Sequence, residues 1–199
     1  LYLAKEKGKN RHIIYEERLH GKLETDDMQN MAMAYAVSKE KKREAITDMI
    51  TKLCVSGVNA IVKSEERLQQ IRSLFDLDGI TVFSDRGNRL VCRNGNYMAE
   101  APDGRPGFED EGYLSLFGDD DIFVESNMIK LRSQNPAAYA VTQEQEVGAA
   151  LQCLSRKEGI PYTMVNFEVF NRNRKWSDED ITLLTLLGHC IGDLLNYSE

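Results

Sequence analysis

The sequence predicts an α+β domain, an antiparallel sheet layered with helices and reached through a long N-terminal connector helix. Three observations predict it. Neither glycine nor proline interrupts residues 22–56, which carry apolar side chains at helical spacing. Runs rich in strand-forming residues recur within 80–92 and 139–170. An amphipathic helix with a clear capping signal follows at residues 177–196.

Composition and charge exclude several classes of protein. The chain has 199 residues, a net charge of -7 and a pI near 5.1, which argues against nucleic acid or an anionic membrane surface as the main partner. The most apolar run, ITLLTLLGHCIGDLL, is too short to span a bilayer, and no signal-segment pattern opens the chain. The four cysteines show no C-x-x-C spacing, so we expect reduced thiols, a cytoplasmic protein and no metal site.

The first half of the chain predicts two helices. Thr25 can cap the long one, whose apolar stripe is interrupted by SKEKKRE at 38–44 and resumes at Ala45. This pattern fits a connector helix that crosses solvent and docks at its far end. A second amphipathic helix is expected from about Ser64 to Phe75.

A hairpin and a long irregular segment come next. Strands are expected at 80–83 and 89–92, with a turn at 85–88. Residues 99–126 hold two prolines, several glycines and many acids, which predicts an irregular segment with at most a short helix, covering one side of the fold. The D-x-D-x-D-G spacing of a calcium loop is absent, so a solvated loop is favoured.

The last third predicts three strands and a helix. The strands are YAVTQ (139–143), GAALQCLS (148–155) and IPYTMVNFEVF (160–170). Alternation in the last strand predicts one buried and one partly polar face. In the helix we expect Ser177 to be the N-cap, Asp180 its capping-box partner, and Trp176 to staple to Ile181. The helix carries an apolar seam of Leu184, Leu187, Ile191 and Leu194. We expect this seam to pack on a sheet or to pair with another copy of the chain.

Residues 1–17, LYLAKEKGKNRHIIYEE, resemble the C-terminal tail of GGDEF (diguanylate cyclase) domains, which end A-L-Y-x-A-K-x-x-G-[KR]-N-[RK]-x-x-x-Y. The resemblance implies that Lys5 and Lys9 are a remnant of a GTP-phosphate-binding site. The GGDEF loop with its Mg²⁺-binding carboxylates is absent, so the fragment itself is expected to have no catalytic residue. The matching positions are Leu1, Tyr2, Ala4, Lys5, Gly8, Lys9, Asn10, Arg11 and Tyr15.

Residues 44–196 resemble a GAF domain, most strongly from ALQCLSRKEGIPYTMVNFEVF through WSDEDITLLTLLGHCIGDLL. The resemblance implies a GAF-like (profilin-like) antiparallel sheet flanked by helices. The family often has glycine where this chain has Tyr162 or Thr163, a difference that bears on how closely a small ligand can approach. The expected organisation is a GGDEF remnant at 1–17, a helical linker at 18–43 and a GAF domain at 44–196.

Together the two resemblances imply a regulatory or sensory module of a bacterial cyclic-di-GMP signalling protein, a diguanylate cyclase. The module would bind a small ligand, dimerise, or do both, and so control attached domains through helical linkers. Expected partners are the attached GGDEF domain and a second copy of the chain, but no nucleic acid and no membrane. The homodimer is expected through the helices, at Leu184, Leu187 and Ile191.

A ligand is expected between the sheet and the 99–126 segment. No cofactor is expected other than an unknown small molecule, although some GAF domains attach bilins through cysteine or bind haem through histidine. All four cysteines are interpreted as buried small hydrophobes and His189 as a packed or interfacial histidine. The candidate lining residues are Phe83, Tyr97, Phe123, Tyr139, Tyr162, Met164, Asn166 and Glu168.

Two alternatives remain open. The first is a GAF-fold dimerisation scaffold with a filled pocket and no ligand. The second is a GAF-fold reductase of free methionine sulfoxide, which needs at least two cysteines converging on the pocket. The predicted placement of Cys92 and Cys153 in strands disfavours the reductase.

Overall fold

The computed structural model describes residues 25–56, 65–84, 87–93, 96–98, 110–144 and 146–197, and the chain divides into two compact units, Leu1–Lys41 and Lys42–Glu199. The GGDEF-like residues 1–17, with Lys5 and Lys9, lie outside the described residues. The elements are α3 (Thr25–Ser56), α5 (Glu65–Leu74), β1 (Gly79–Ser84), β2 (Gly87–Arg93), β3 (Asn96–Met98), α6 (Glu111–Leu114), β4 (Ile122–Glu125), η1 (Met128–Lys130), α7 (Leu131–Gln134), α8 (Pro136–Glu144), β5 (Val147–Lys157), β6 (Ile160–Phe170) and α9 (Asp178–Tyr197).

The described strands form one antiparallel sheet in the order β3-β2-β1-β6-β5-β4, which confirms the predicted fold class. β5 and β6 form a hairpin through the turn at Glu158 and Gly159, both with positive φ, where glycine is the residue that adopts the conformation without strain. β1 pairs with β6, so strands from the two halves of the Lys42–Glu199 unit meet at the centre of the sheet.

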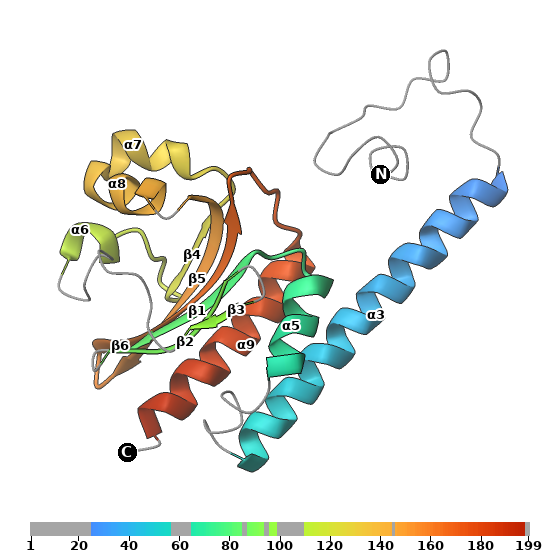
Figure 1. Ribbon diagram of the computed structural model, residues 1–199, viewed down its shortest axis with the longest axis horizontal. Coiled ribbons are helices and arrows are strands. Elements are labelled where there is room, and N and C mark those ends of the chain that lie inside the picture. The colour runs from blue at the N-terminus through green and yellow to red at the C-terminus, as the bar shows by residue number, and fades with distance from the viewer. Residues whose placement is uncertain are drawn as a thin grey trace. The chain divides into compact units, whose positions relative to one another are not determined.

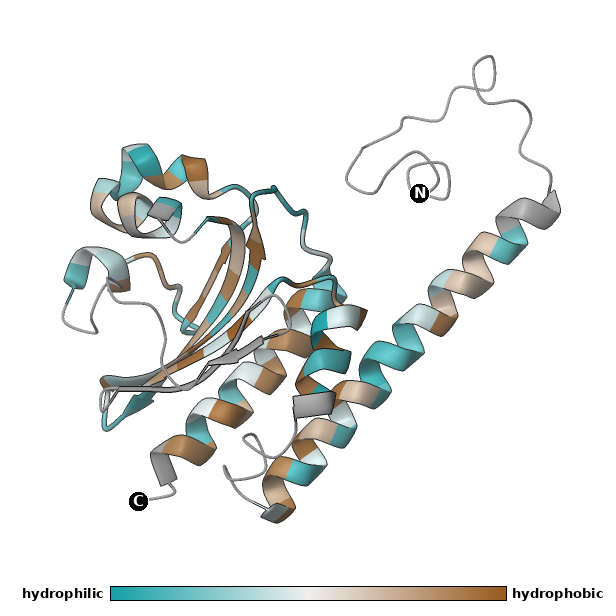
Figure 2. Cartoon of the chain, viewed as in Figure 1, coloured by the Kyte–Doolittle hydropathy of each residue, from teal (hydrophilic) through white to brown (hydrophobic). Residues whose placement is uncertain are grey.

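One face of the sheet is covered by α5, α9 and the part of α3 that follows Lys42 (Figure 1). In α9 apolar side chains recur every three or four residues and point at the sheet; Figure 2 shows this helix with its hydrophobic residues. Each fully buried leucine or isoleucine stabilises the fold by about 1.5–3 kcal/mol. The buried members from the two long helices are Ala45, Ile46, Met49, Leu53, Leu184, Leu187, Ile191 and Leu195.

The opposite face is covered by α6, η1, α7 and α8 (Figure 1). Phe117 lies between Tyr113 and Phe123, with ring centroids 5.9 and 6.0 Å away. Met128 and Leu131 complete the core on this side. The sheet is therefore buried on both faces, which is why residues 162–169 of β6 are all buried although they alternate apolar and polar.

Two sequence predictions are wrong. Residues 139–143 belong to helix α8, because Asn135 accepts a hydrogen bond from the Ala138 amide and Pro136 occupies the first helical position. This local start signal outweighs the strand preference of Tyr139 and its neighbours. Within the segment predicted to be irregular, Ile122–Glu125 form edge strand β4, paired with β5, whereas the short helix that the prediction allowed is present as α6, Glu111–Leu114.

The expected start of α9 is confirmed in part. The Ser177 hydroxyl accepts the Asp180 amide at 3.1 Å, as an N-cap does. The Asp180 carboxylate binds Lys42 and Arg174 instead of the Ser177 amide, so the predicted capping-box bond is not formed. The Trp176 indole packs into the same core as Ile181 and donates to the Glu125 carbonyl at 3.2 Å.

The seam residues Leu184, Leu187 and Ile191 are fully buried against the sheet of their own chain. They are therefore occupied within the monomer and do not offer the surface on which the predicted homodimer was placed. The homodimer itself stays a prediction. None of the helices in the described ranges is both long and apolar enough to cross a membrane.

Candidate functional site

Four buried polar side chains lie on the sheet face that points toward α6, η1, α7 and α8. Asn166 of β6 is directly opposite Thr81 of β1 on one side and Gln152 of β5 on the other. Glu168 lies two residues further along the same face of β6. All four are at most 4% exposed, and we call them the polar row: Thr81, Gln152, Asn166 and Glu168.

Three members of the polar row have hydrogen-bond partners. The Thr81 hydroxyl donates to Glu168 Oε2 at 3.1 Å. The Tyr113 hydroxyl donates to Gln152 Oε1 at 2.6 Å. Tyr113 is itself positioned by the start of α6, where its amide donates to the Asp110 carboxylate at 2.9 Å. Helix α6 is thereby tied to the polar row by a side chain that is 4% exposed.

Asn166 is the exception. Its side chain is fully buried, yet neither Oδ1 nor Nδ2 has a hydrogen-bond partner among the described residues. A carboxamide offers two donors and an acceptor, and leaving such a group unsatisfied in the interior costs about 1–3 kcal/mol. Since buried polar groups in native proteins are almost always paired, a partner from outside these residues is expected at Asn166.

Apolar side chains frame the polar row and include most of the predicted lining residues. Phe83, Phe123 and Met164 belong to the core of this face, and Tyr139 of α8 packs against it. Tyr162 is buried near the start of β6, where Lys157 lies 5.3 Å from its ring. The structure therefore brings six of the predicted lining residues to one face of the sheet. They are Phe83, Phe123, Tyr139, Met164, Asn166 and Glu168. The side chain of Tyr97 lies outside the described residues.

The sequence prediction omitted Thr81, Gln152 and Tyr113. Two signals were present. Gln152 interrupts the otherwise apolar strand GAALQC, and Thr81 alternates with Phe83, a predicted lining residue. Tyr113 carried no such signal, because only the fold brings α6 to the middle of β5.

The described thiols do not face the polar row. Cys153 points to the opposite face, toward α9, where a Cβ at Gly188 would lie 2.6 Å from its Sγ. Burial raises the pKa of Cys153 to about 12, so at neutral pH it is an unreactive thiol. Cys54, in the last turn of α3, is exposed, contrary to the prediction.

These positions disfavour two of the chemistries considered. Cys153 is unsuited to act as a reductase nucleophile, and the side chain of Cys92 lies outside the described residues. Cys190 and His189 are half-buried on α9. Within the ranges that the structure describes, no group of three His, Cys, Asp or Glu residues could hold a metal ion.

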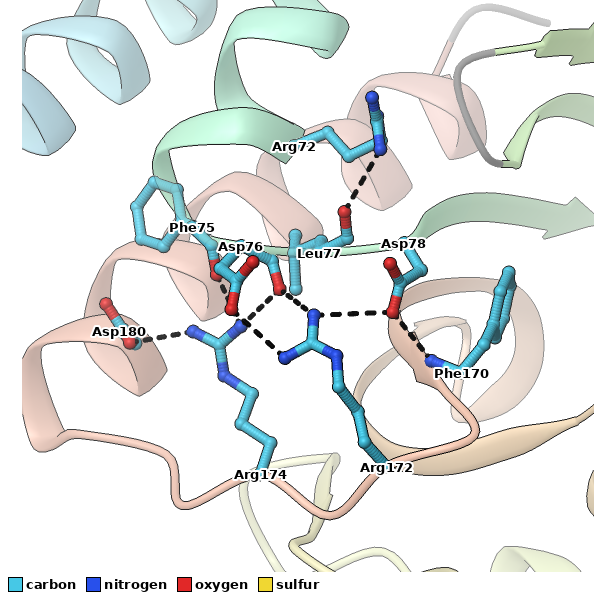
Figure 3. Close-up of polar contacts among 9 residues, drawn as sticks. All are labelled: Arg72, Phe75, Asp76, Leu77, Asp78, Phe170, Arg172, Arg174 and Asp180. Atoms are coloured by element: carbon cyan, nitrogen blue, oxygen red, sulfur yellow. Dashed lines mark hydrogen bonds and ion pairs between the residues drawn. The ribbon is translucent and has the colours of Figure 1, made fainter. Parts of the chain in front are cut away.

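A second polar cluster links the segment after β6 to the turn between α5 and β1 (Figure 3). The Arg174 guanidinium donates to Asp180 at 2.9 Å, to the Asp76 carbonyl at 3.0 Å and to the Phe75 carbonyl. It also lies 4.2 Å from the Trp176 ring. Burial lowers the pKa of Arg174, and Asp180 opposes that change.

Arg172 completes this cluster. It donates to the Asp76 carboxylate at 3.0 Å and to Asp78 at 3.4 Å, and Asp78 also accepts the Phe170 amide at 2.8 Å. Figure 3 shows both arginines reaching from the segment after β6 toward the start of β1. The cluster therefore fixes the path of the chain from the sheet into α9.

Helix α3 joins the same cluster at the start of α9. Lys42 Nζ lies 2.5 Å from Asp180 Oδ1, and Arg43 Nε lies 3.0 Å from Glu179 Oε1. Asp180 thus bridges α3 and Arg174. The beginning of α9 is bound to both α3 and the strand segment that leads from the polar row.

No family model and no curated protein sequence matches the chain. The solved structures that are similar to it include the following three. The chromophore-binding domain of a Stigmatella aurantiaca bacteriophytochrome matches with a TM-score of 0.54 and 15% identity, over 79% of this chain and 60% of that one. A red/green cyanobacteriochrome in its green-light-absorbing state matches with a TM-score of 0.51 and 18% identity, over 69% of this chain and 92% of that one. The GAF domain of cyanobacteriochrome TePixJ matches with a TM-score of 0.44 and 14% identity, over 63% of this chain and 81% of that one.

The first two similarities establish the fold. The chain has a GAF-like fold, an antiparallel sheet between helical layers, and spans about 60% of the length of the bacteriophytochrome structure. The resemblance of residues 1–17 to a GGDEF tail is not supported by these comparisons and stays a prediction.

Proposed function

We propose that the Lys42–Glu199 unit is a sensory module that binds a small organic molecule at the polar row. The observation that carries this proposal is the fully buried Asn166 carboxamide, which has no partner among the described residues. A ligand that places one donor and one acceptor against this amide would remove its desolvation cost. Ligand binding would thus supply the hydrogen bonds that Asn166 Oδ1 and Nδ2 lack among the described residues.

The surroundings of Asn166 indicate the chemistry of the ligand. Glu168 places a buried carboxylate beside Asn166, where it accepts from Thr81, and negative charge at this position favours donor groups on the ligand. Phe83, Phe123 and Met164 supply an apolar frame. The proposed ligand class is a flat or compact molecule with an apolar body and adjacent N–H and C=O groups, such as an amide or a nitrogen heterocycle.

A bound molecule is also expected because one of the known structures of similar fold is a chromophore-binding domain. In this chain Cys54, Cys153 and Cys190 are placed on helices or on the opposite face of the sheet. None of these three described thiols is positioned for covalent attachment at the polar row. The proposed binding therefore uses no covalent bond to Cys54, Cys153 or Cys190.

The proposed signal leaves the site along β6. A ligand at Asn166 would change the packing of β6, whose end is held by Asp78 and leads through Arg172 and Arg174 to α9. Helices α9 and α3 are joined at Asp180. A ligand that favours one arrangement of these two helices shifts the population of that arrangement, and attached domains would respond.

The test is mass spectrometry of freshly purified protein under native and denaturing conditions. We expect a mass difference that disappears on denaturation in the wild type and is absent in Asn166→Leu. Leu186→Ala is the matched control, because Leu186 is 55% exposed on α9 and far from the polar row in the fold. A clean apo mass for the wild type, or ligand retained by Asn166→Leu, would contradict the proposal.

The wider context that we propose is a cyclic-di-GMP signalling protein, a diguanylate cyclase, with this module as its regulatory part. It rests on the dense motif in residues 1–17, where Lys5 and Lys9 match phosphate-binding positions of GGDEF domains. The parent protein, purified as its source makes it, tests this proposal: it should convert radiolabelled GTP to cyclic di-GMP. A parent protein without a GGDEF signature loop would refute it.

The alternative proposal, a dimerisation scaffold, is favoured by one observation. Helix α3 exposes three large apolar side chains in its first half, Met33, Tyr35 and Val37, each more than half exposed. Light scattering after size exclusion should then report twice the chain mass. Met33→Glu combined with Val37→Glu should return the chain to a monomer, whereas Asp48→Asn should leave the dimer intact.

A further inference from the structure

Helices α3 and α9 lie alongside each other and run in the same direction within the Lys42–Glu199 unit. Their first contact is the ion pair of Arg43 with Glu179, next to that of Lys42 with Asp180. Further along, apolar residues of both helices share one core. The last buried residue of α3 in that core is Leu53, and Ile191 of α9 belongs to the same core.

The spacing along the two helices places two cysteines opposite each other. Cys54 follows Arg43 by 11 residues, and Cys190 follows Glu179 by 11 residues. Eleven residues are three helical turns, about 16.5 Å, and return a side chain to nearly the same face of its helix. Two parallel helices that are paired at one level therefore bring the side chains three turns later together as well.

The surroundings of the two thiols agree with this placement. Cys54 is exposed, whereas Cys190 is half-buried and packs against the core. The pKa of Cys190 is raised to about 11, chiefly by burial and in part by the neighbouring Cys54. Cys54 is thus a neighbour of Cys190 and is open to solvent.

We propose that Cys54 and Cys190 are an oxidisable dithiol site, which a hydroperoxide closes to a disulfide between α3 and α9. Cys54 lies two residues before the end of α3, and because helix ends fray, the backbone there can adjust to the short Cβ–Cβ separation that a disulfide requires. Cys153 takes no part, because it is buried on the far side of α9 against β5.

The reaction balances in two steps. The sulfur of Cys54, as thiolate, attacks the hydroperoxide; an S–O bond forms, the O–O bond breaks and an alcohol leaves, which gives a sulfenic acid. The Cys190 sulfur then attacks the Cys54 sulfur; the S–S bond forms, the S–O bond breaks, and water leaves with the Cys190 proton. The two thiols lose two electrons, and the hydroperoxide is reduced to alcohol and water.

Closure would lock the two helices together at a second point. Arg43 and Glu179 already join them three turns earlier. With the disulfide formed, α3 and α9 can no longer slide or rotate against each other. The site therefore offers oxidative control over the helix pair, independent of any ligand at the polar row.

The experiment treats the full chain with hydrogen peroxide, blocks remaining thiols with iodoacetamide, digests with trypsin and analyses the peptides without reductant. Trypsin leaves each cysteine in a separate peptide, with Cys54 in 53–63 and Cys190 in 176–199. We expect these two peptides to be linked, the link to be lost with dithiothreitol, and the thermal midpoint of the oxidised chain to lie several degrees above that of the reduced chain.

Two variants make the result decisive. Cys54→Ser removes an exposed thiol, so the chain keeps its fold and should lose the linked pair and the rise in midpoint. Cys92→Ser, the matched control, should retain both. The proposal is overturned if Cys54 is recovered free or over-oxidised beside a free Cys190, if it is linked to Cys92 or Cys153, or if it joins two copies of the chain.

Discussion

Arg174 and Asp180 form a buried ion pair, with 2.9 Å between Nη2 and Oδ2 and side chains that are 10% and 8% exposed. The same carboxylate accepts a hydrogen bond from Lys42 of α3, so one acidic side chain forms ion pairs with two cations at the start of α9. The pair therefore joins three parts of the fold: α3, α9 and the turn after α5, which Arg174 reaches through the Phe75 and Asp76 carbonyls.

Asp180→Asn should destabilise the fold strongly. The amide keeps the shape of the side chain but leaves Arg174 buried without its counter-charge, which typically costs about 3–5 kcal/mol. Urea unfolding monitored by circular dichroism measures the free energy of unfolding. The control is Asp48→Asn: Asp48 is 59% exposed and pairs with Arg67 at the surface, so at most about 1 kcal/mol is expected. Equal losses in the two variants would mean that the buried ion pair contributes no more to the free energy of unfolding than the surface pair does.

Asn166→Leu should stabilise the protein in the absence of ligand. The substitution removes a buried amide that has no partner among the described residues and replaces it with an apolar group of similar size. A gain of about 1–3 kcal/mol in the free energy of unfolding is expected. Gln152→Leu is the matched control on the neighbouring strand and should have the opposite sign, because it breaks the hydrogen bond from Tyr113. A stability loss in Asn166→Leu would show that the amide is already paired.

Gly188→Ala should destabilise the packing of α9 on β5. In a helix this substitution normally stabilises by about 1 kcal/mol. Here the new Cβ would lie 2.6 Å from Cys153 Sγ and 2.8 Å from Cys153 Cβ, so the helix or the strand must move. We expect a net loss of about 1–3 kcal/mol in thermal or urea unfolding. Leu186→Ala, on the exposed side of the same helix, should change stability by no more than about 0.5 kcal/mol.

The buried thiol of Cys153 predicts a loss of stability in alkali. Its pKa is raised from 9.0 to about 12 in the folded chain, chiefly by burial. A raised pKa stabilises the fold fully below pH 9, and this contribution is lost as the pH rises toward 12, because the unfolded chain releases the proton first. The slope approaches about 1.4 kcal/mol per pH unit.

The comparison with Cys153→Ala isolates that slope. The alanine variant should be less stable at pH 7, since it leaves a small cavity, but its stability should fall less steeply above pH 9. Urea unfolding at several pH values measures both quantities. Parallel pH profiles for the two proteins would show that Cys153 ionises as easily in the folded state as in the unfolded state.

Local patterns were sufficient to predict much of this fold. The β5–β6 hairpin follows from apolar alternation around a glycine turn, and α9 follows from its Ser177 cap and apolar spacing, because each of these signals lies within a few neighbouring residues. The long helix α3 was predicted with both of its ends. The strand assigned to 139–143 failed where the Asn135–Pro136 start signal competed with residues of strand preference.

The site depends on contacts between residues that are distant in the chain. Asn166 and Glu168 were predicted as lining residues from alternation, but that Asn166 lies between Thr81 and Gln152 follows only from the pairing of β6 with β1 and β5. Likewise, Asp180 carries a cap signature in the sequence, while its ion pairs with Lys42 and Arg174 exist because α3 packs beside α9. Short-range preferences determine the elements of this protein, whereas strand register and helix packing, which join residues up to 138 positions apart, determine its polar row and its ion cluster.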